Sequence, residues 1–155
     1  MAFFASPLSQ PPRRTYYPFS REKMIKADDT PASARPSAEK GASTSMQDIH
    51  GYHAHIYFNA QTLDQARALC EAATGKFAVQ MGRVHQKLVG PHPDWSCQLA
   101  FGHEQLADVT LWLALNRDGL VVFLHPLTGD ELRDHTDHAI WMGAVRPLDL
   151  SALTG

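Results

Sequence analysis

Histidine is the residue whose placement in this chain most clearly suggests chemistry. Nine histidines occur among 155 residues, and six of them fall in short motifs after residue 50. They are His53 and His55 in one strand-like run, His92 between two prolines, His125 before Pro126, and His135 with His138. Neutral imidazole is the commonest protein ligand for divalent metals. If folding brings these side chains together, they would form a metal site.

The first motif places two histidines and a tyrosine on one face of a strand. Tyr52–Phe58 alternates in character and is rich in aromatic residues, which is typical of a β-strand. Side chains alternate between the faces of a strand, so His53, His55 and Tyr57 share one face. The apolar residues between them are expected to pack on helices. The His/Tyr face would then be a solvated surface, a dimer interface or a cavity, and its composition favours the cavity.

Hydrophobic periodicity predicts the elements that must position these motifs. The capping-box pattern Thr62-Leu63-Asp64-Gln65 predicts the start of a helix, and Gly75 its end. In order, the predicted elements are strand 52–58, helix 62–75, strand 77–89, turn 90–94, strand 95–101, helix 105–116, strand 120–125 and a helical turn near 134–140. The order β-α-β-β-α-β predicts an α+β, ferredoxin-like fold, with a four-stranded antiparallel sheet and two helices on one face.

This fold is expected to bring the separate histidines to one edge of the sheet. In the strand order fourth, first, third, second, we expect the first and third strands to run parallel and the fourth antiparallel to the first. The starts of the first and third strands then share an edge with the end of the fourth. The histidines expected at that edge are His53, His55, His92 and His125, with His85 on the outer strand and His135 and His138 folding back.

Charge and hydropathy exclude two classes of partner. Residues 1–45 hold seven Lys/Arg and four Asp/Glu, whereas residues 46–155 hold seven Lys/Arg and twelve Asp/Glu. An acidic folded part argues against nucleic-acid binding, because phosphate contact needs clustered cations. No apolar run approaches the roughly 18 residues of a membrane-spanning helix, so we expect no membrane partner.

Composition also divides the chain into two parts. Residues 1–48 are rich in Pro, Ser, Ala and charge, which predicts a flexible, dispensable extension before a single domain over 49–155. The two cysteines, Cys70 and Cys97, lie in helix-like and strand-like runs and are expected to be buried, reduced thiols. We therefore expect a cytoplasmic protein.

Three motifs in this order and spacing resemble the DOPA 4,5-dioxygenase family. They are Tyr52–Phe58, Gly90-Pro91-His92-Pro93, and the stretch from His125-Pro126-Leu127-Thr128-Gly129-Asp130 to Trp141-Met142-Gly143. The resemblance covers roughly residues 50–147. It implies a ferredoxin-like fold, often dimeric, and extradiol cleavage of a catechol by O₂ at non-haem Fe(II), with Zn(II) or another divalent metal as a substitute.

The resemblance implies roles for particular residues. The expected metal ligands are His55, His92 and His125, and Asp94, Glu131 or Asp134 could supply a carboxylate instead, because carboxylate is the usual third ligand of such iron sites. The expected acid–base residues are His53 and His135. The expected substrate contacts are Tyr57 and Trp95 with the aromatic ring and Arg83 with a carboxylate, although Arg83 could equally be a solvated surface residue.

Two other functions are compatible with the same residues. A ferredoxin-like domain can serve as a non-enzymatic module that binds a metal or a small molecule, since fold alone does not give function. A zinc hydrolase would use the same histidines to activate water. Oxygen consumption with a catechol separates the dioxygenase from both.

Overall fold

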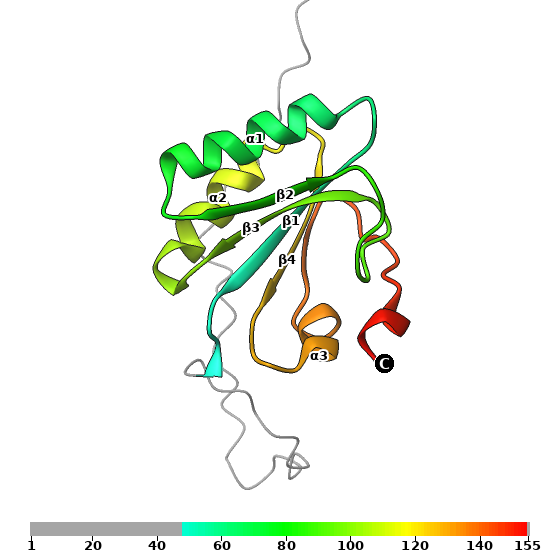
Figure 1. The fold of residues 1–155 in the computed structure, drawn as a ribbon. Helices are drawn as coiled ribbons and strands as arrows, with labels where there is room; N and C mark the ends of the chain where they lie inside the picture. Colours follow the sequence, from blue (N-terminus) through cyan, green and yellow to red (C-terminus); the bar gives the residue numbers. More distant parts are fainter. Residues whose placement is uncertain (1–47, 155) are drawn as a thin grey trace, which may run out of the picture. The chain divides into compact units, whose positions relative to one another are not determined.

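The computed structural model describes residues 48–154, which form one α+β unit (Figure 1). The predicted flexible extension, residues 1–48, lies outside the described residues apart from its last position. The elements are β1 (Tyr52–Phe58), α1 (Leu63–Lys76), β2 (Gln80–His85), β3 (Trp95–Phe101), α2 (Leu106–Asn116), β4 (Val121–Pro126), α3 (Glu131–His135) and β5 (Ile140–Met142). Short 3₁₀ helices cover His103–Gln105 and Leu150–Leu153.

The sheet has five strands in the order β2-β3-β1-β4-β5, and all neighbouring strands are antiparallel. The predicted β-α-β-β-α-β order is present, and α1 and α2 lie over the same face (Figure 1). The prediction of a four-stranded ferredoxin-like sheet is therefore correct only in part. The C-terminal part adds α3 and β5, and β5 extends the sheet beyond β4.

The expectation that the first and third strands run parallel is wrong. In the structure Tyr52 pairs with Phe101, and Phe58 pairs with Trp95. The helical crossover returns β2 in the direction of β1, and the turn after β2 reverses the chain, so β3 must oppose β1. The start of β3 consequently lies beside the end of β1, and His92 enters the sheet from the edge opposite to His125.

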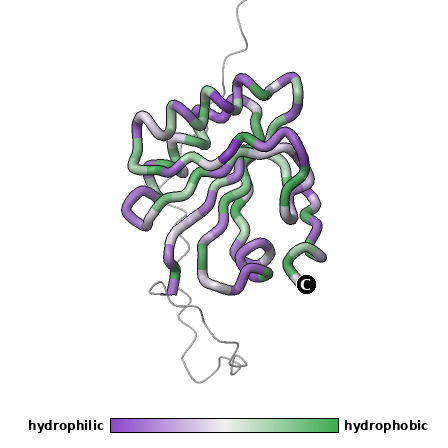
Figure 2. Tube along the Cα trace, viewed as in Figure 1, coloured by the Kyte–Doolittle hydropathy of each residue, from purple (hydrophilic) through white to green (hydrophobic). Residues whose placement is uncertain are grey.

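The apolar side of the sheet packs on α1 and α2, as the alternation predicts. Figure 2 shows hydrophobic and hydrophilic residues alternating along the strands. The fully buried core includes Ala54 and Ile56 from β1 and Leu99 from β3. Cys70 and Cys97 are free and buried in this core, which confirms their prediction as small buried residues. The opposite side of β1 is left for His53, His55 and Tyr57.

The bounds of α1 agree with the prediction to within one residue, but the contacts at its ends differ from those expected. Thr62 makes no capping bond to α1, because its hydroxyl accepts the Asn59 N–H and bonds the Asn59 side chain. Gln65 instead donates to the Asp118 carbonyl at 2.7 Å, which ties α1 to the turn before β4. Gly75 lies inside α1, whose last turn is closed by a bond from the Phe77 N–H. The predicted start of the helix is confirmed, since α1 begins at Leu63, but the capping bond is absent and α1 ends at Lys76, one residue beyond the predicted glycine stop.

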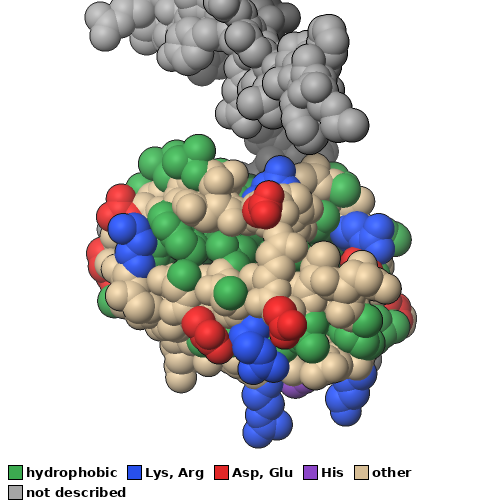
Figure 3. Space-filling view, turned by 90° about the horizontal axis from the view of Figure 1, so that it is seen from above, with side chains coloured by type: hydrophobic (Ala, Val, Ile, Leu, Met, Phe, Trp, Pro, Cys, Tyr) green, Lys and Arg blue, Asp and Glu red, His purple; other side chains and the backbone are tan. Residues whose placement is uncertain are grey.

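The view from above Figure 1 shows a surface of mixed character (Figure 3). Lysine and arginine side chains are interspersed there with acidic and hydrophobic ones, and histidine is barely visible. Within residues 48–154, no helix is long and apolar enough to cross a membrane.

Candidate metal centre

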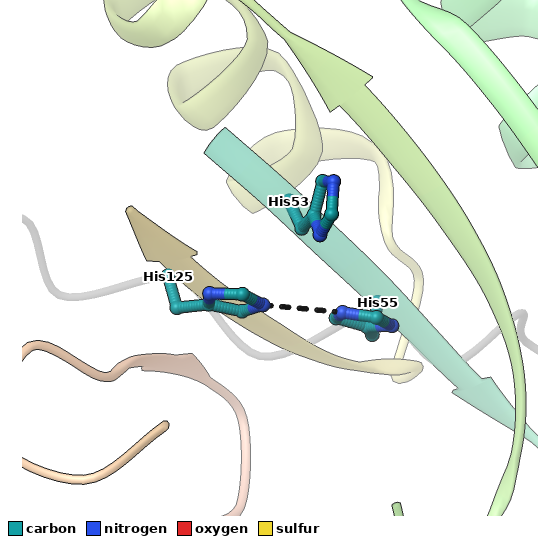
Figure 4. A group of neighbouring side chains, drawn as sticks. All are labelled: His53, His55 and His125. Atoms are coloured by element: carbon teal, nitrogen blue, oxygen red, sulfur yellow. Dashed lines mark hydrogen bonds between the residues drawn. The ribbon is translucent and has the colours of Figure 1, made fainter. Parts of the chain in front are cut away.

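Three histidines from two neighbouring strands form the centre of the site. His53 and His55 lie on the same face of β1, and His125 on β4 pairs directly with His53. One nitrogen from each ring can be chosen so that all three lie within 4.8 Å of one another (Figure 4). Because β1 and β4 are central, hydrogen-bonded strands, the backbone itself fixes this grouping.

The orientation of His125 leaves one nitrogen free for a ligand. Its Nδ1 lies 2.8 Å from the Pro126 carbonyl oxygen, which can only accept, so Nδ1 carries the proton. The lone pair is therefore on Nε2, and that atom points at Nε2 of His55, 3.4 Å away (Figure 4). A hydrogen bond from the far side of the ring is the usual device that orients a metal-binding histidine.

His92 reaches the same centre from the opposite edge of the sheet. The turn before β3 curls back over the sheet face, and Gly90 begins it with φ 59°. The His92 ring packs on His55 with ring centroids 3.9 Å apart. Its Nδ1 bonds the hydroxyl of Tyr57 at 2.8 Å. His92 thus belongs to the cluster although the strand directions predicted from the sequence were wrong.

His135 closes the cluster from α3. Its ring lies 4.2 Å from that of His125, and its Nδ1 donates to the Glu131 carbonyl at 2.8 Å. The short helix is held by Asp134, which is 2 % exposed. That carboxylate accepts bonds from the backbone and hydroxyl of Thr128 at 2.8 and 2.7 Å.

The three alternative carboxylates lie outside the group of close ligand atoms, and their role as ligands stays a prediction. Asp94 accepts two bonds from Arg146, and Asp134 is bonded to Thr128 and His138. Glu131 is exposed on α3. Among the described residues, the group of close ligand atoms contains histidines only.

Burial keeps the imidazoles neutral. Desolvation lowers the pKa of His55 well below its usual value, and the neighbouring histidines lower it further. Desolvation, followed by repulsion from His135, lowers the pKa of His92 and of His125 to about 4. The pKa of His53 is lowered as well, mainly by burial. Neutral rings have free lone pairs at pH 7, which is the state that binds metals.

A pocket of about 200 Å³ opens beside the cluster. Its lining includes His55 and His92 from the cluster and Arg83 from β2, together with Ser96 and Gln98 from β3. The structure therefore places the predicted Arg83 next to two predicted metal ligands. The local irregularity in the β2–β3 pairing between Met81 and Val84 accompanies this position of Arg83.

The two predicted aromatic contacts lie on different sides of the sheet. Tyr57 is buried on the cluster face, where Trp141 approaches it with ring centroids 6.1 Å apart. Trp95 packs on the core and contacts Phe58 at 6.2 Å, so the structure does not bring it to the histidines. Trp141 and Phe123, whose rings are 4.6 Å apart, were missed as part of the aromatic surroundings.

Comparisons with known proteins assign the chain to a family. Residues 52–152 match the Dopa 4,5-dioxygenase family, and the chain belongs to it. A DOPA 4,5-dioxygenase from Amanita muscaria is 36% identical over 68% of this chain and 50% of its own length. An "Uncharacterized 21.2 kDa protein" from Botryotinia fuckeliana is 37% identical over 67% of this chain and 61% of its own. The chain thus spans about half to three fifths of the length of these curated relatives.

A solved structure also matches. A "putative dioxygenase" from Nostoc punctiforme superposes with a TM-score of 0.70 and 40% sequence identity. The match covers 72% of this chain and 97% of that protein. The family expected from the sequence motifs is confirmed by these comparisons.

Proposed function

We propose that this protein is an extradiol dioxygenase that opens the ring of a catechol with O₂ at a histidine-bound Fe(II). The family membership supports a dioxygenase, and the cluster of neutral imidazoles beside a pocket supplies a place for the metal. The single observation that carries the proposal is the convergence of His53, His55 and His125 next to a pocket of substrate size.

The donor set fits a metal ion. Two nitrogens each about 2.1 Å from a metal are roughly 3 to 3.4 Å apart for angles near 90–109°, from standard bond lengths. The Nε2 atoms of His55 and His125 lie 3.4 Å apart, so this pair needs almost no rearrangement. Imidazole suits Fe(II), and also Zn(II), Cu(II) and Ni(II). We infer Fe(II) because only a redox metal supports O₂ chemistry with a catechol.

The geometry favours His53 over His92 as the third ligand. His92 bonds Tyr57 through Nδ1, and its ring packs on His55 from the side of the pocket. The set His55, His92 and His125 expected from the sequence stays a prediction that mutagenesis can test. With His53 on the metal, His92 and His135 become the acid–base candidates.

We place the substrate in the pocket of about 200 Å³. Bound Fe(II) would supply a redox centre with positions for both catechol hydroxyls and for O₂. His92 lines the pocket and can hold a proton at Nε2 while Tyr57 orients its Nδ1. That proton would be exchanged with a catechol hydroxyl or with the ring-opened product. Arg83 would bind a carboxylate on the substrate through its planar fork.

The proposal is tested by oxygen consumption. Protein loaded anaerobically with Fe(II) is mixed with L-DOPA and with unsubstituted catechol, and dissolved oxygen and the visible spectrum are followed. We expect oxygen loss with a new yellow absorbance from the ring-opened semialdehyde. Protein loaded with Zn(II) is the matched control and should consume none.

Two competing functions have their own signatures. A three-histidine set without a carboxylate is also the ligand set of catalytic zinc, so a zinc hydrolase remains the second candidate. Ester turnover by the Zn(II) form without oxygen would support it. Tight metal binding with neither activity would support a non-enzymatic module.

The predicted cytoplasmic location and homodimer stay predictions. The exposed side chains of Leu111 and Leu115 on α2 are apolar surface that a second subunit would cover. Sedimentation of the full chain measures the oligomeric state directly.

A further inference from the structure

The turn that carries His92 is hydrogen-bonded at two points to the C-terminal segment, the stretch that holds Arg146 and Asp149. The Pro91 carbonyl accepts the backbone N–H of Asp149 at 2.9 Å. Beyond His92, the Asp94 carboxylate accepts two bonds from Arg146, one from Nε at 2.7 Å and one from Nη2 at 2.9 Å. The C-terminal segment therefore bonds to the turn on both sides of His92, at Pro91 and at Asp94.

The backbone bond within the turn is too long to fix the position of His92 firmly. This bond runs from the His92 N–H to the Val89 carbonyl and is long, at 3.4 Å. A bidentate arginine–carboxylate pair fixes direction as well as distance, since both components are planar. The Asp94–Arg146 pair is therefore the contact best suited to set where His92 lies.

Residues of this turn line two different pockets. Pro91 and His92 line the pocket of about 200 Å³ beside the cluster. Asp94 and Arg146 line a second pocket of about 440 Å³, which also includes Tyr57. The 2.8 Å bond between the Tyr57 hydroxyl and His92 joins the two walls. Movement of the turn would change the shape of the pocket that we assign to the substrate.

We propose that Arg146 is a positioning residue. Through Asp94 it holds His92 against His55 and Tyr57, and so sets the inner wall of the substrate pocket. The effect on substrate binding rests on the proposed function, whereas the effect on the turn does not. Sequence motifs give no indication of this link, because Arg146 lies 52 positions from Asp94.

The expected effect is local. The Arg146 and Asp94 side chains are 43% and 27% exposed, and partly exposed ion pairs contribute at most about 1 kcal/mol to the stability of a fold. Loss of that amount would raise the population of an open turn about fivefold. The fold should survive, but catalysis and ligand binding are sensitive to displacements near 1 Å.

The test is hydrogen–deuterium exchange of the full-length, metal-free chain. In Arg146→Ala, the amides of His92 and Asp149, which donate to the Val89 and Pro91 carbonyls, should exchange about fivefold faster. The ¹⁵N shift of His92 Nδ1 should change as its bond to Tyr57 loosens. The charge-reversed double variant D94R/R146D should restore most of the protection.

Arg133→Ala is the matched control, because it removes the exposed pair of Arg133 with Asp137 (3.6 Å) on a different segment. The proposal would be overturned if Arg146→Ala showed the same amide exchange rates and the same ¹⁵N shift of His92 Nδ1 as the wild type or as this control.

A second measurement separates this proposal from the proposed function. Binding of 4-nitrocatechol to the Fe(II)-loaded protein should weaken about fivefold in Arg146→Ala while metal content stays unchanged. Unchanged 4-nitrocatechol affinity in Arg146→Ala would contradict control of the substrate pocket. If the wild type binds no 4-nitrocatechol at all, the proposed function fails, and the exchange data still decide whether Arg146 holds the turn.

Discussion

His53 and His125 lie directly opposite each other on β1 and β4, and their rings meet edge to face with centroids 5.4 Å apart. Paired positions on neighbouring strands hold their side chains on the same face at close range. This pairing brings His53 into the ligand group with His55, although an acid–base role was expected for it. The backbone pairing of the central strands therefore fixes the group of close imidazole nitrogens.

Replacement of each histidine by asparagine should separate ligands from neighbours. Asparagine is similar in size but a poor ligand, so variants of His53, His55 and His125 should each lose Fe(II) affinity by at least about 100-fold. His92→Asn should keep affinity within about tenfold. Isothermal titration calorimetry under anaerobic conditions measures the Fe(II) affinity of all four variants. Loss of binding in His92→Asn together with full binding in the His53 variant would restore the ligand set expected from the sequence.

The stability of the metal-free protein should fall as pH is lowered from about 6.5 to 4. The pKa of His92 and of His125 is about 4 in the folded state, whereas the ordinary pKa of a histidine ring is 6.5. In that window the unfolded chain binds more protons, so acid favours unfolding. Each group contributes at most about 3.5 kcal/mol, from about 1.4 kcal/mol per pKa unit.

Urea denaturation at pH 7, 6 and 5 measures this slope. The variant His125→Asn removes one of the titrating groups and should show a visibly flatter dependence. A midpoint that does not change between pH 7 and 5 would contradict the buried, neutral state of these rings.

Asp134→Asn should destabilise the fold by roughly 2–3 kcal/mol, the range for buried bonds to a charged group. The carboxylate accepts bonds from Thr128 and His138, and an amide would turn an NH₂ group toward donors. Asp137→Asn, with a side chain 68% exposed, is the control and should change stability by less than about 0.5 kcal/mol. Equal stability of the two variants in urea would show that Asp134 does not anchor α3.

Arg83→Gln should selectively weaken the binding of a catechol that carries a carboxylate. A charge-assisted bond contributes about 1.5–3 kcal/mol, so affinity should fall by roughly 10- to 100-fold for L-DOPA and remain unchanged for plain catechol. Lys87→Gln, which removes another exposed cation after β2, controls for general charge effects. An equal loss for both ligands would mean that Arg83 does not contact the carboxylate.

Much of the site could be predicted from local pattern. Alternation along Tyr52–Phe58 correctly placed His53, His55 and Tyr57 on one face, because side-chain direction in a strand is a local property. Trp95, which was expected to contact the substrate ring, packs on the core instead.

The remaining features depend on tertiary contacts. The return of His92 over the sheet is fixed by Asp149 and Arg146, which no short-range pattern connects to it. The strand β5 is only three residues long and forms by pairing with β4, so it has no periodicity to detect. The assumed strand order is present in the structure, and only the direction of the third strand was wrong, because the turn between β2 and β3 reverses the chain.

The most direct test of the central claim is the fate of isotopic oxygen. Fe(II)-loaded protein is given catechol under ¹⁸O₂, and the ring-opened product is analysed by mass spectrometry. The dioxygenase account predicts one ¹⁸O atom in the new carboxylate, and the His53→Asn variant should yield no product. An unopened ring, or a carboxylate whose oxygen comes only from water, would contradict it.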